Sequence, residues 1–282
     1  MSDTNQTIVS DEDLKILADT PSENGLDKDN PHPRDSHIQF FDEGHIYDID
    51  GDRSFMSTTT FVHTFFEEFD ADKIIKKMMG GRNWEKSKYF GKTPDEIKNE
   101  WEENRDLAAR NGTLMHACIE YFYNKWTFPF EPPIEFKEQF PAFTERVVEE
   151  KGYLPYRTEW FVYDKEHKIA GSIDMLYQVS ENDPDTLLIY DWKRTAKLTK
   201  TNSFQSGKGP LAHLPDTNYW HYTMQLNIYR HILETLYDKK IAGMFLVAFH
   251  PTRNTFSQEQ VPRLEQETQD LFDWRKKIIQ EE

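Results

Sequence analysis

Three short apolar runs, each bounded by polar turn-forming residues, occupy the middle of the chain. They cover residues 159–162, 169–177 and 187–193 and are rich in aromatic and β-branched residues. Such side chains fit a pleated, half-buried surface, so runs of this kind favour β-strands. The pattern therefore predicts three consecutive strands, which we expect to form a meander.

Helical periodicity surrounds these strands. Apolar residues recur at helical spacing along residues 134–150, 219–237 and 261–279, which predicts three amphipathic helices. Residues 241–249 form a continuous apolar run of strand length and predict one more buried strand. The resulting order of helix, three strands, helix and strand is an α/β arrangement.

The first part of the chain carries weaker signals. Residues 1–36 are polar and acidic, and we expect a disordered or loosely docked arm there. Residues 38–41 and 45–49 predict two short strands, closed by the turn-forming pair Asp50-Gly51.

A well-formed helix start follows at Thr93. Proline comes next, and Glu96 lies three residues after the threonine, which is the pattern of a capping box. We expect this helix to end near Arg110. Gly112 then precedes a second amphipathic segment, residues 114–123.

Composition narrows the possible classes of function. The chain has 282 residues, a net charge of −16 and a pI near 5.1, so it is not a generic nucleic-acid-binding protein. The single cysteine, Cys118, excludes an intrachain disulfide and any metal cluster built from several cysteines. The sequence has no apolar run of transmembrane length and no signal-like N-terminus. We therefore expect a soluble intracellular protein without a membrane partner.

Charge is distributed unevenly along the chain. Residues 1–36 are strongly acidic, whereas the segment 191–209 contains five basic residues and one acid. The basic residues of that segment are Lys193, Arg194, Lys197, Lys200 and Lys208. A basic strip beside carboxylates suits an anionic substrate, although chance lysines on a solvated loop would give the same composition.

Three charged residues interrupt the second and third predicted strands. Asp174 and Asp191 each follow a core-like apolar residue, and Lys193 lies two positions after Asp191 on the same strand face. Carboxylates inside a sheet are costly unless a cation compensates them, and hard divalent cations prefer oxygen ligands. The trio predicts a site for a divalent metal ion and a phosphate. The alternative is a solvent-facing ion pair between Asp191 and Lys193 on an edge strand.

Helical segments carry further candidates. The imidazole of His116 could bind a metal ion or pack in the core. Gln225 and Tyr229 are four residues apart and share one helix face, which could also be an ordinary face with one polar residue. The hydroxyl run that includes Ser57 and Thr59 predicts a helix N-cap, and its hydroxyls could alternatively contact a phosphate.

Taken in order, these motifs resemble the PD-(D/E)xK nuclease superfamily, and within it the RecB-like exonuclease branch. The matching segments are Gly112-Thr113-Leu114-Met115-His116, Glu159, Gly171-Ser172-Ile173-Asp174, Asp191-Trp192-Lys193 and Gln225 to Tyr229. They span about two-fifths of the chain. The set is similar to the mitochondrial genome-maintenance exonuclease group and to relatives in large DNA viruses. The branch with an iron–sulfur cluster needs four cysteines, which this chain lacks.

The resemblance implies a fold, a cofactor and residue roles. The implied fold is a restriction-endonuclease-like αβββαβ core, with a mixed sheet flanked by helices and an N-terminal helical region. It implies Mg²⁺ or Mn²⁺ held by His116, Asp174, Asp191 and the backbone carbonyl of Trp192, with the acids also catalytic. Lys193 would be the catalytic lysine.

The resemblance also implies supporting roles. Glu159 would be catalytic, by orienting water or holding a second metal ion, whereas Gln225 and Tyr229 would contact the substrate. The segment Ser57-Thr58-Thr59 is similar to an S-V-T motif of relatives, from which Thr58 departs. We assign to the substrate-binding set Gln225, Tyr229, Ser57, Thr59, Arg194 and Thr195.

The resulting hypothesis is a metal-dependent DNA nuclease, most simply an exonuclease acting on single strands or free DNA ends. Repair, recombination and replication-end processing are pathways that suit the resemblance. One alternative is a non-catalytic nucleic-acid-binding protein built on a nuclease fold. The other is a metal-dependent phosphohydrolase of small phosphoesters, although the chain lacks the adjacent His-Asp pair that such enzymes commonly carry.

We divide the chain into four parts. Residues 1–36 are the acidic arm, residues 37–110 form a hairpin and helical region that roofs the active site, residues 111–254 are the nuclease core, and residues 255–282 contain the C-terminal helix. Basic and aromatic residues of the roof could contact a nucleic-acid strand, and stacking of bases is conceivable on Trp84, Tyr89 and Trp192.

Overall fold

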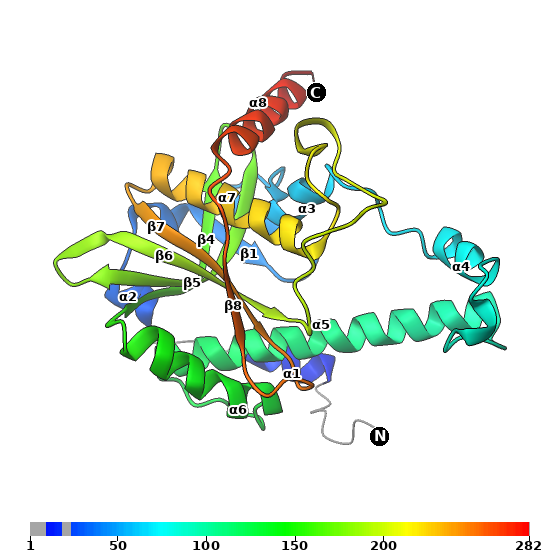
Figure 1. Ribbon diagram of the computed structural model, residues 1–282. Coiled ribbons are helices and arrows are strands. Elements are labelled where there is room, and N and C mark those ends of the chain that lie inside the picture. The colour runs from blue at the N-terminus through cyan, green and yellow to red at the C-terminus, as the bar shows by residue number, and fades with distance from the viewer. Residues whose placement is uncertain (1–9, 19–23, 282) are drawn as a thin grey trace.

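A mixed β-sheet forms the centre of the protein, as the computed structural model shows for residues 10–18 and 24–281 (Figure 1). The strands lie in the order β3-β5-β6-β7-β8, and β4 pairs with β5. Their bounds are β3 Met56–Ser57, β4 Leu154–Asp164, β5 Ile169–Ser180, β6 Asp183–Arg194, β7 Lys240–Phe249 and β8 Ser257–Gln260.

The predicted meander is present. Strands β4, β5 and β6 pair antiparallel, whereas β6 and β7 pair parallel. A parallel pair needs a crossover connection, and the helix α7 (Asn218–Leu236) provides it. Met175 pairs with Tyr190, so the next position on each strand places Asp174 beside Asp191. The αβββαβ core and the mixed sheet are therefore as expected.

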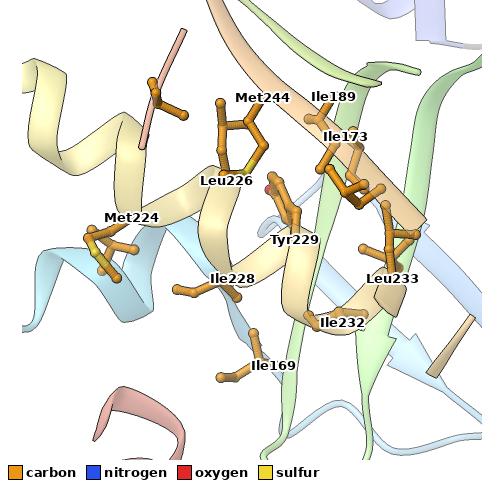
Figure 2. Packing of buried hydrophobic residues seen from close by; sticks show 14 of the residues in the cluster. Ile169, Ile173, Ile189, Met224, Leu226, Ile228, Tyr229, Ile232, Leu233 and Met244 are labelled. Carbon is orange, nitrogen blue, oxygen red and sulfur yellow. The ribbon is translucent and has the colours of Figure 1, made fainter. Parts of the chain in front are cut away.

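One layer of helices covers one face of the sheet. It consists of α7, α3 (Thr58–His63) and α8 (Glu265–Glu281). Figure 2 shows how apolar side chains of α7 interdigitate with those of β5, β6 and β7, and how Tyr229 lies among them. Burying these side chains is the main stabilising contribution to this half of the molecule.

The second layer covers the opposite face. It consists of α5 (Pro94–Asn124), α6 (Ile134–Phe143) and a following π-helical turn, η3 (Thr144–Glu149). The Trp192 ring packs against aromatic residues of α6 and is only 1% exposed. Stacking of a base on Trp192, one of the sequence-based possibilities, is therefore excluded by burial.

The helix α5 is one continuous helix. The sequence predicted a helix ending near Arg110 and a second segment after Gly112, and that prediction was wrong. The capping box of Thr93 and Glu96 is present, but Gly112 lies inside the helix. Glycine costs roughly 1 kcal/mol in a helix interior. Apolar contacts of the following turns, which bury Leu114 among others, offset that cost.

The first half of α5 extends beyond the sheet, and α4 (Ala71–Met79) packs near its far end (Figure 1). Lys98 of α5 bonds to Asp72 of α4 at 3.1 Å. A short 3-10 turn, η2 (Trp84–Lys86), lies between the two helices. We call residues 71–110 the helical projection.

The N-terminal segment forms α1 (Asp11–Ala18), α2 (Leu26–Asp29) and a 3-10 turn, η1 (Pro33–His37). Its last part is bonded to β4. The Asp35 carboxylate accepts hydrogen bonds from Arg157 and Trp160, both at 2.8 Å. Residues 24–36 thus differ from the loosely docked arm expected, because their polar side chains find buried partners. The arm's residues 1–9 and 19–23 lie outside the described residues.

The hairpin of β1 (Ile38–Phe41) and β2 (Ile46–Ile49) is present. The pair Asp50-Gly51 does not join these two strands. It follows β2 and turns the chain back so that Ile49 bridges Asp52. None of the described helices is long and apolar enough to cross a membrane.

Candidate active site

His116, Glu159 and Asp174 come from three separate elements and converge on one point. Nδ1 of His116 lies 3.6 Å from Oε1 of Glu159 and 3.7 Å from Oδ2 of Asp174. One ligand atom from each of the three residues lies within 4.8 Å of the others. This cluster, which we call the His-Glu-Asp cluster, is partly buried between α5 and strands β4 and β5.

The backbone of Trp192 on β6 holds two members of the cluster in place. Nε2 of His116 lies 2.9 Å from the Trp192 carbonyl oxygen. The Trp192 N–H donates to Oδ2 of Asp174 at 2.8 Å. The imidazole therefore has one nitrogen tied to β6, while its other nitrogen is directed at the two acids.

Glu159 reaches the cluster through an unusual backbone conformation. Its φ is +42°, in the left-handed region that is costly for a residue with a side chain. The register pairs Thr158 with Met175 and Trp160 with Ile173, so Glu159 lies across from Asp174 where ladder pairing is interrupted. Ser172 donates a hydrogen bond to Oε2 of Glu159 at 2.8 Å. Nothing in the sequence pattern signals this backbone feature.

Asp191 and Lys193 form the second half of the site. Nζ of Lys193 lies 2.7 Å from Oδ2 of Asp191, and their side chains are 17% and 3% exposed. The alternative of a solvent-facing pair on an edge strand is wrong, because β6 lies between β5 and β7. The same ammonium lies 4.5 Å from the ring centroid of Tyr222 on α7, a cation–π contact that the sequence analysis did not anticipate.

The pKa shifts of the site residues indicate that burying its carboxylates together is unfavourable unless positive charge lies nearby. Burial, together with Asp191 and Glu159, raises the pKa of Asp174 to about 7 although His116 opposes the shift. Burial alone would lower the pKa of His116, but Asp174 and Glu159 raise it to about 9. Likewise Asp191 and Asp174 hold the pKa of the buried Lys193 ammonium above its ordinary value. A positive charge at this point is therefore strongly favoured.

Glu120 is a nearby acid that the sequence-based site omitted. It lies one turn after His116 on α5, and burial together with Glu159 raises its pKa to about 8. The only sequence signal for it is its spacing of four residues from His116, which places both side chains on one helix face.

The proposed substrate-binding residues are placed differently from one another. Gln225 donates to the Tyr229 hydroxyl at 3.2 Å, so the pair does share one face of α7. The Ser57 hydroxyl accepts from the Thr60 N–H at 3.1 Å and is the N-cap of α3, as expected. Thr59 is exposed in the first turn of the same helix.

Two further members of that set face other partners. The Arg194 guanidinium forms a buried ion pair with Glu135 of α6. The Thr195 hydroxyl donates to the Lys197 carbonyl at 3.1 Å. The structure thus does not bring Arg194 to the His-Glu-Asp cluster, because Glu135 on α6 binds its guanidinium instead.

The donor set of the cluster fits a hard divalent cation. One imidazole nitrogen and two carboxylates surround a single point, and the Trp192 carbonyl lies against the same imidazole. Mg²⁺ and Mn²⁺ accept this combination of oxygen and nitrogen ligands. The elevated pKa of Asp174 also indicates a place where a bound cation would lower the free energy.

Among the comparisons with known proteins, a family model identifies the family. A family model described as the PD-(D/E)XK nuclease superfamily matches residues 137–281, just over half of the chain. This range contains Glu159, Asp174, Asp191 and Lys193, whereas His116 precedes it. A search of the curated proteins found no match.

Solved structures give weaker similarities. One is titled "Crystal structure of SSO0001", with 12% sequence identity and a TM-score of 0.32 over 81% of this chain and 77% of that one. Another is titled "Putative exonuclease" from Eubacterium rectale, with 11% identity and a TM-score of 0.37 over 81% of this chain and 79% of that one.

Proposed function

Because the chain belongs to the PD-(D/E)XK nuclease superfamily, we propose that it is a metal-dependent DNA nuclease that acts as an exonuclease on single strands or free ends. The observation that carries this proposal is the convergence of the His-Glu-Asp cluster with the Asp191–Lys193 pair. One short stretch of β6 connects the two groups. Its Trp192 backbone bonds to His116 and Asp174, and the residues on either side of Trp192 are Asp191 and Lys193.

His116, through Nδ1, and Asp174 would hold the metal ion, with Asp191 as a further ligand. The Trp192 carbonyl lies at the opposite imidazole nitrogen and would fix the orientation of the ring. When bound, Mg²⁺ or Mn²⁺ would polarise the phosphodiester and lower the pKa of an attacking water molecule. The left-handed backbone of Glu159 directs its carboxylate at the His-Glu-Asp cluster. We therefore assign to Glu159 the role of orienting water or a second cation.

Lys193 would stabilise negative charge on the phosphorus oxygens as the bond to the leaving oxygen breaks. Its two neighbouring carboxylates keep it protonated, so it is suited to donate hydrogen bonds and unsuited to act as a general base. The Tyr222 ring beneath the ammonium limits where the side chain can point.

The preference for single strands or free ends rests on the region we assigned as a roof. The helical projection carries several lysines, and the loop 197–217 meets it through Lys77, whose ammonium lies 5.7 Å from the Phe204 ring centroid. Lys208 of that loop also pairs with Glu67 at 3.0 Å. A loop and a helical projection that meet in this way would favour a thin strand over a rigid duplex, if the substrate passes between them.

The test is incubation with end-labelled single-stranded and double-stranded DNA in Mg²⁺, Mn²⁺ or chelator. We expect cleavage in either metal ion, none with chelator, and none of circular single-stranded DNA if the mode is exonucleolytic. Cleavage of circles would change the mode to endonucleolytic. Binding without cleavage in any metal ion would favour the non-catalytic alternative, and faster turnover of a dinucleotide than of an oligonucleotide would favour a small-phosphoester hydrolase.

A further inference from the structure

A shallow, open cavity lies at the surface between the loop 197–217 and the N-terminal end of α7. Its volume is about 340 Å³, which is large enough for a small ligand group. Hydroxyl and amide side chains dominate its lining, which consists of Thr199, Thr201, Asn202, Ser203, Phe204, Asp216, Thr217 and Asn218. In Figure 1 the loop leads into the yellow end of α7.

Thr217 is the N-cap residue of α7, yet its side chain makes no capping hydrogen bond. The residue is only 8% exposed, and its hydroxyl oxygen has no hydrogen-bond partner among the described residues. An unpartnered buried hydroxyl is costly, and the first N–H groups of a helix also lack partners within the helix. Both kinds of donor lie at the same end of a 19-residue helix.

Other side chains of the lining are already engaged in shaping the loop. Asn218 accepts from the Thr199 N–H at 2.8 Å and donates to the Lys197 carbonyl at 3.1 Å. Asn202 accepts from the Phe204 N–H at 2.9 Å. The acid in the lining, Asp216, is bonded to His221 at 2.8 Å. The loop is thus held in one shape by its own bonds, and these leave the Thr217 hydroxyl unused.

Phe204 stands at the rim of this cavity with 87% of its surface exposed. Exposing a phenylalanine ring to water is unfavourable. A base that stacks on the ring removes this apolar surface from water and so lowers the free energy. Lys77 of the helical projection lies 5.7 Å from the ring centroid, which adds positive charge beside the ring. A single nucleotide could use both features, since its base would stack on the exposed ring and its phosphate would accept hydrogen bonds from the donors of the cavity.

The cavity is also close to the candidate active site along the helix. Asn218 in its lining is one helical turn before Tyr222, and the Tyr222 ring lies 4.5 Å from the Lys193 ammonium. One turn of an α-helix rises about 5.4 Å. The cavity and Lys193 therefore both lie near the N-terminal end of α7.

We propose that the loop 197–217 and the N-terminus of α7 form a nucleotide subsite for the substrate strand. The Thr217 hydroxyl and the first N–H groups of α7 donate to a backbone phosphate, and the base of that nucleotide stacks on Phe204. This inference rests on the proposed nuclease function, since the ligand is a phosphodiester strand.

The experiment measures binding of a fluorescent single-stranded oligothymidylate in chelator, so that no cleavage intervenes. Phe204→Ala removes the stacking ring and should weaken binding about 5- to 150-fold. Thr217→Val removes one hydrogen-bond donor without changing side-chain shape and should weaken binding about 2- to 10-fold.

Two matched controls are available. Thr223→Val removes another buried hydroxyl of α7 that has no hydrogen-bond partner within the described part of the chain, and Thr223 is not part of the cavity lining. Phe122→Ala removes another exposed ring, on α5. Both controls should bind the oligonucleotide as the wild type does, and thermal unfolding of all four variants checks that each is folded.

The outcomes separate the possibilities. Wild-type binding by both Phe204→Ala and Thr217→Val, or no oligonucleotide binding by the wild-type protein, would overturn the subsite. If Thr217→Val weakens competition by inorganic phosphate but leaves strand binding unchanged, the cavity takes free phosphate and the nucleotide subsite is again overturned. Cleavage of DNA in Mn²⁺ is measured separately, so the nuclease proposal can fail or survive independently.

Discussion

Gly171 on β5 lies directly against the phenol of Tyr229 on α7. A Cβ atom at residue 171 would sit 2.6 Å from the Tyr229 hydroxyl oxygen and 2.9 Å from the Thr58 hydroxyl oxygen. Two motifs that are 58 residues apart in the sequence are thus one steric unit, three residues from Asp174. The glycine is required by close approach of a helix to the sheet.

Gly171→Ala should therefore destabilise the protein by about 1–3 kcal/mol, because the added methyl group overpacks the contact between α7 and β5. Urea unfolding measures the change. Gly112→Ala is the matched control. Outside the backbone of its own helix turn, no described atom lies within 4 Å of a Cβ there, and the position is inside a helix, so this variant should gain up to about 1 kcal/mol. Equal stability of the two variants would contradict the packing argument.

Asp174→Asn should reduce DNA cleavage by at least about 100-fold while the protein stays folded. The amide oxygen can still accept from the Trp192 N–H, but the carboxylate charge beside His116 is lost. Initial rates on a labelled oligonucleotide give the comparison. Asp42→Asn, in the exposed turn before β2, serves as the control and should retain the wild-type rate.

Metal binding should be visible without any activity measurement. A cation at 100 times its dissociation constant stabilises the folded state by about 2.7 kcal/mol, so Mn²⁺ should raise the unfolding temperature of the wild-type protein. His116→Gln and Asp174→Asn each remove a ligand of the cluster and should lose most of that rise. A full rise in both variants would mean that the ion binds elsewhere.

Arg194 and Glu135 should behave as a structural pair. Arg194→Met leaves the Glu135 carboxylate, which is 1% exposed, without its partner and should cost about 3–5 kcal/mol in urea unfolding. The double variant Arg194→Met with Glu135→Met should recover much of this loss. If the single variant keeps wild-type stability and instead weakens oligonucleotide binding, the sequence-based assignment of Arg194 to the substrate would be supported.

Acid should destabilise the protein partly through Asp164. Burial raises the pKa of this carboxyl, but hydrogen bonds from the His167 ring and from the N–H groups of Glu166 and His167 outweigh burial and lower it below 3.8. A lowered folded-state pKa contributes stability above the unfolded-state value, and that stability is lost as pH falls through the folded-state value. Asp164→Asn should therefore flatten the decline in unfolding free energy below about pH 4. A parallel decline in both proteins would contradict this.

The strands and most helices were predictable because local pattern and tertiary burial agree. The alternation around Asp191 and Lys193 placed both side chains on one face, and their 2.7 Å contact follows from that period of two. The capping residues Ser57 and Thr93 were also predictable, because an N-cap bond forms within four residues.

Other features depend on contacts between distant segments. The helix α5 continues through Gly112 because its later turns pack against the rest of the protein, and the local sequence pattern does not show this packing. The division of the chain into four parts and the catalytic and metal-binding roles of individual residues remain predictions.

The sequence by itself determined which side chains are available, which strand faces they occupy and the order of the αβββαβ elements, since these follow from periods of two and 3.6 residues. Only the tertiary structure decided that Glu159 joins His116 through a left-handed backbone and that Arg194 turns to Glu135. It also decided that the Thr217 hydroxyl has no hydrogen-bond partner among the residues that the structure describes. The physical reason is that burial and hydrogen-bond partners come from residues far away in the chain, and no local spacing encodes them.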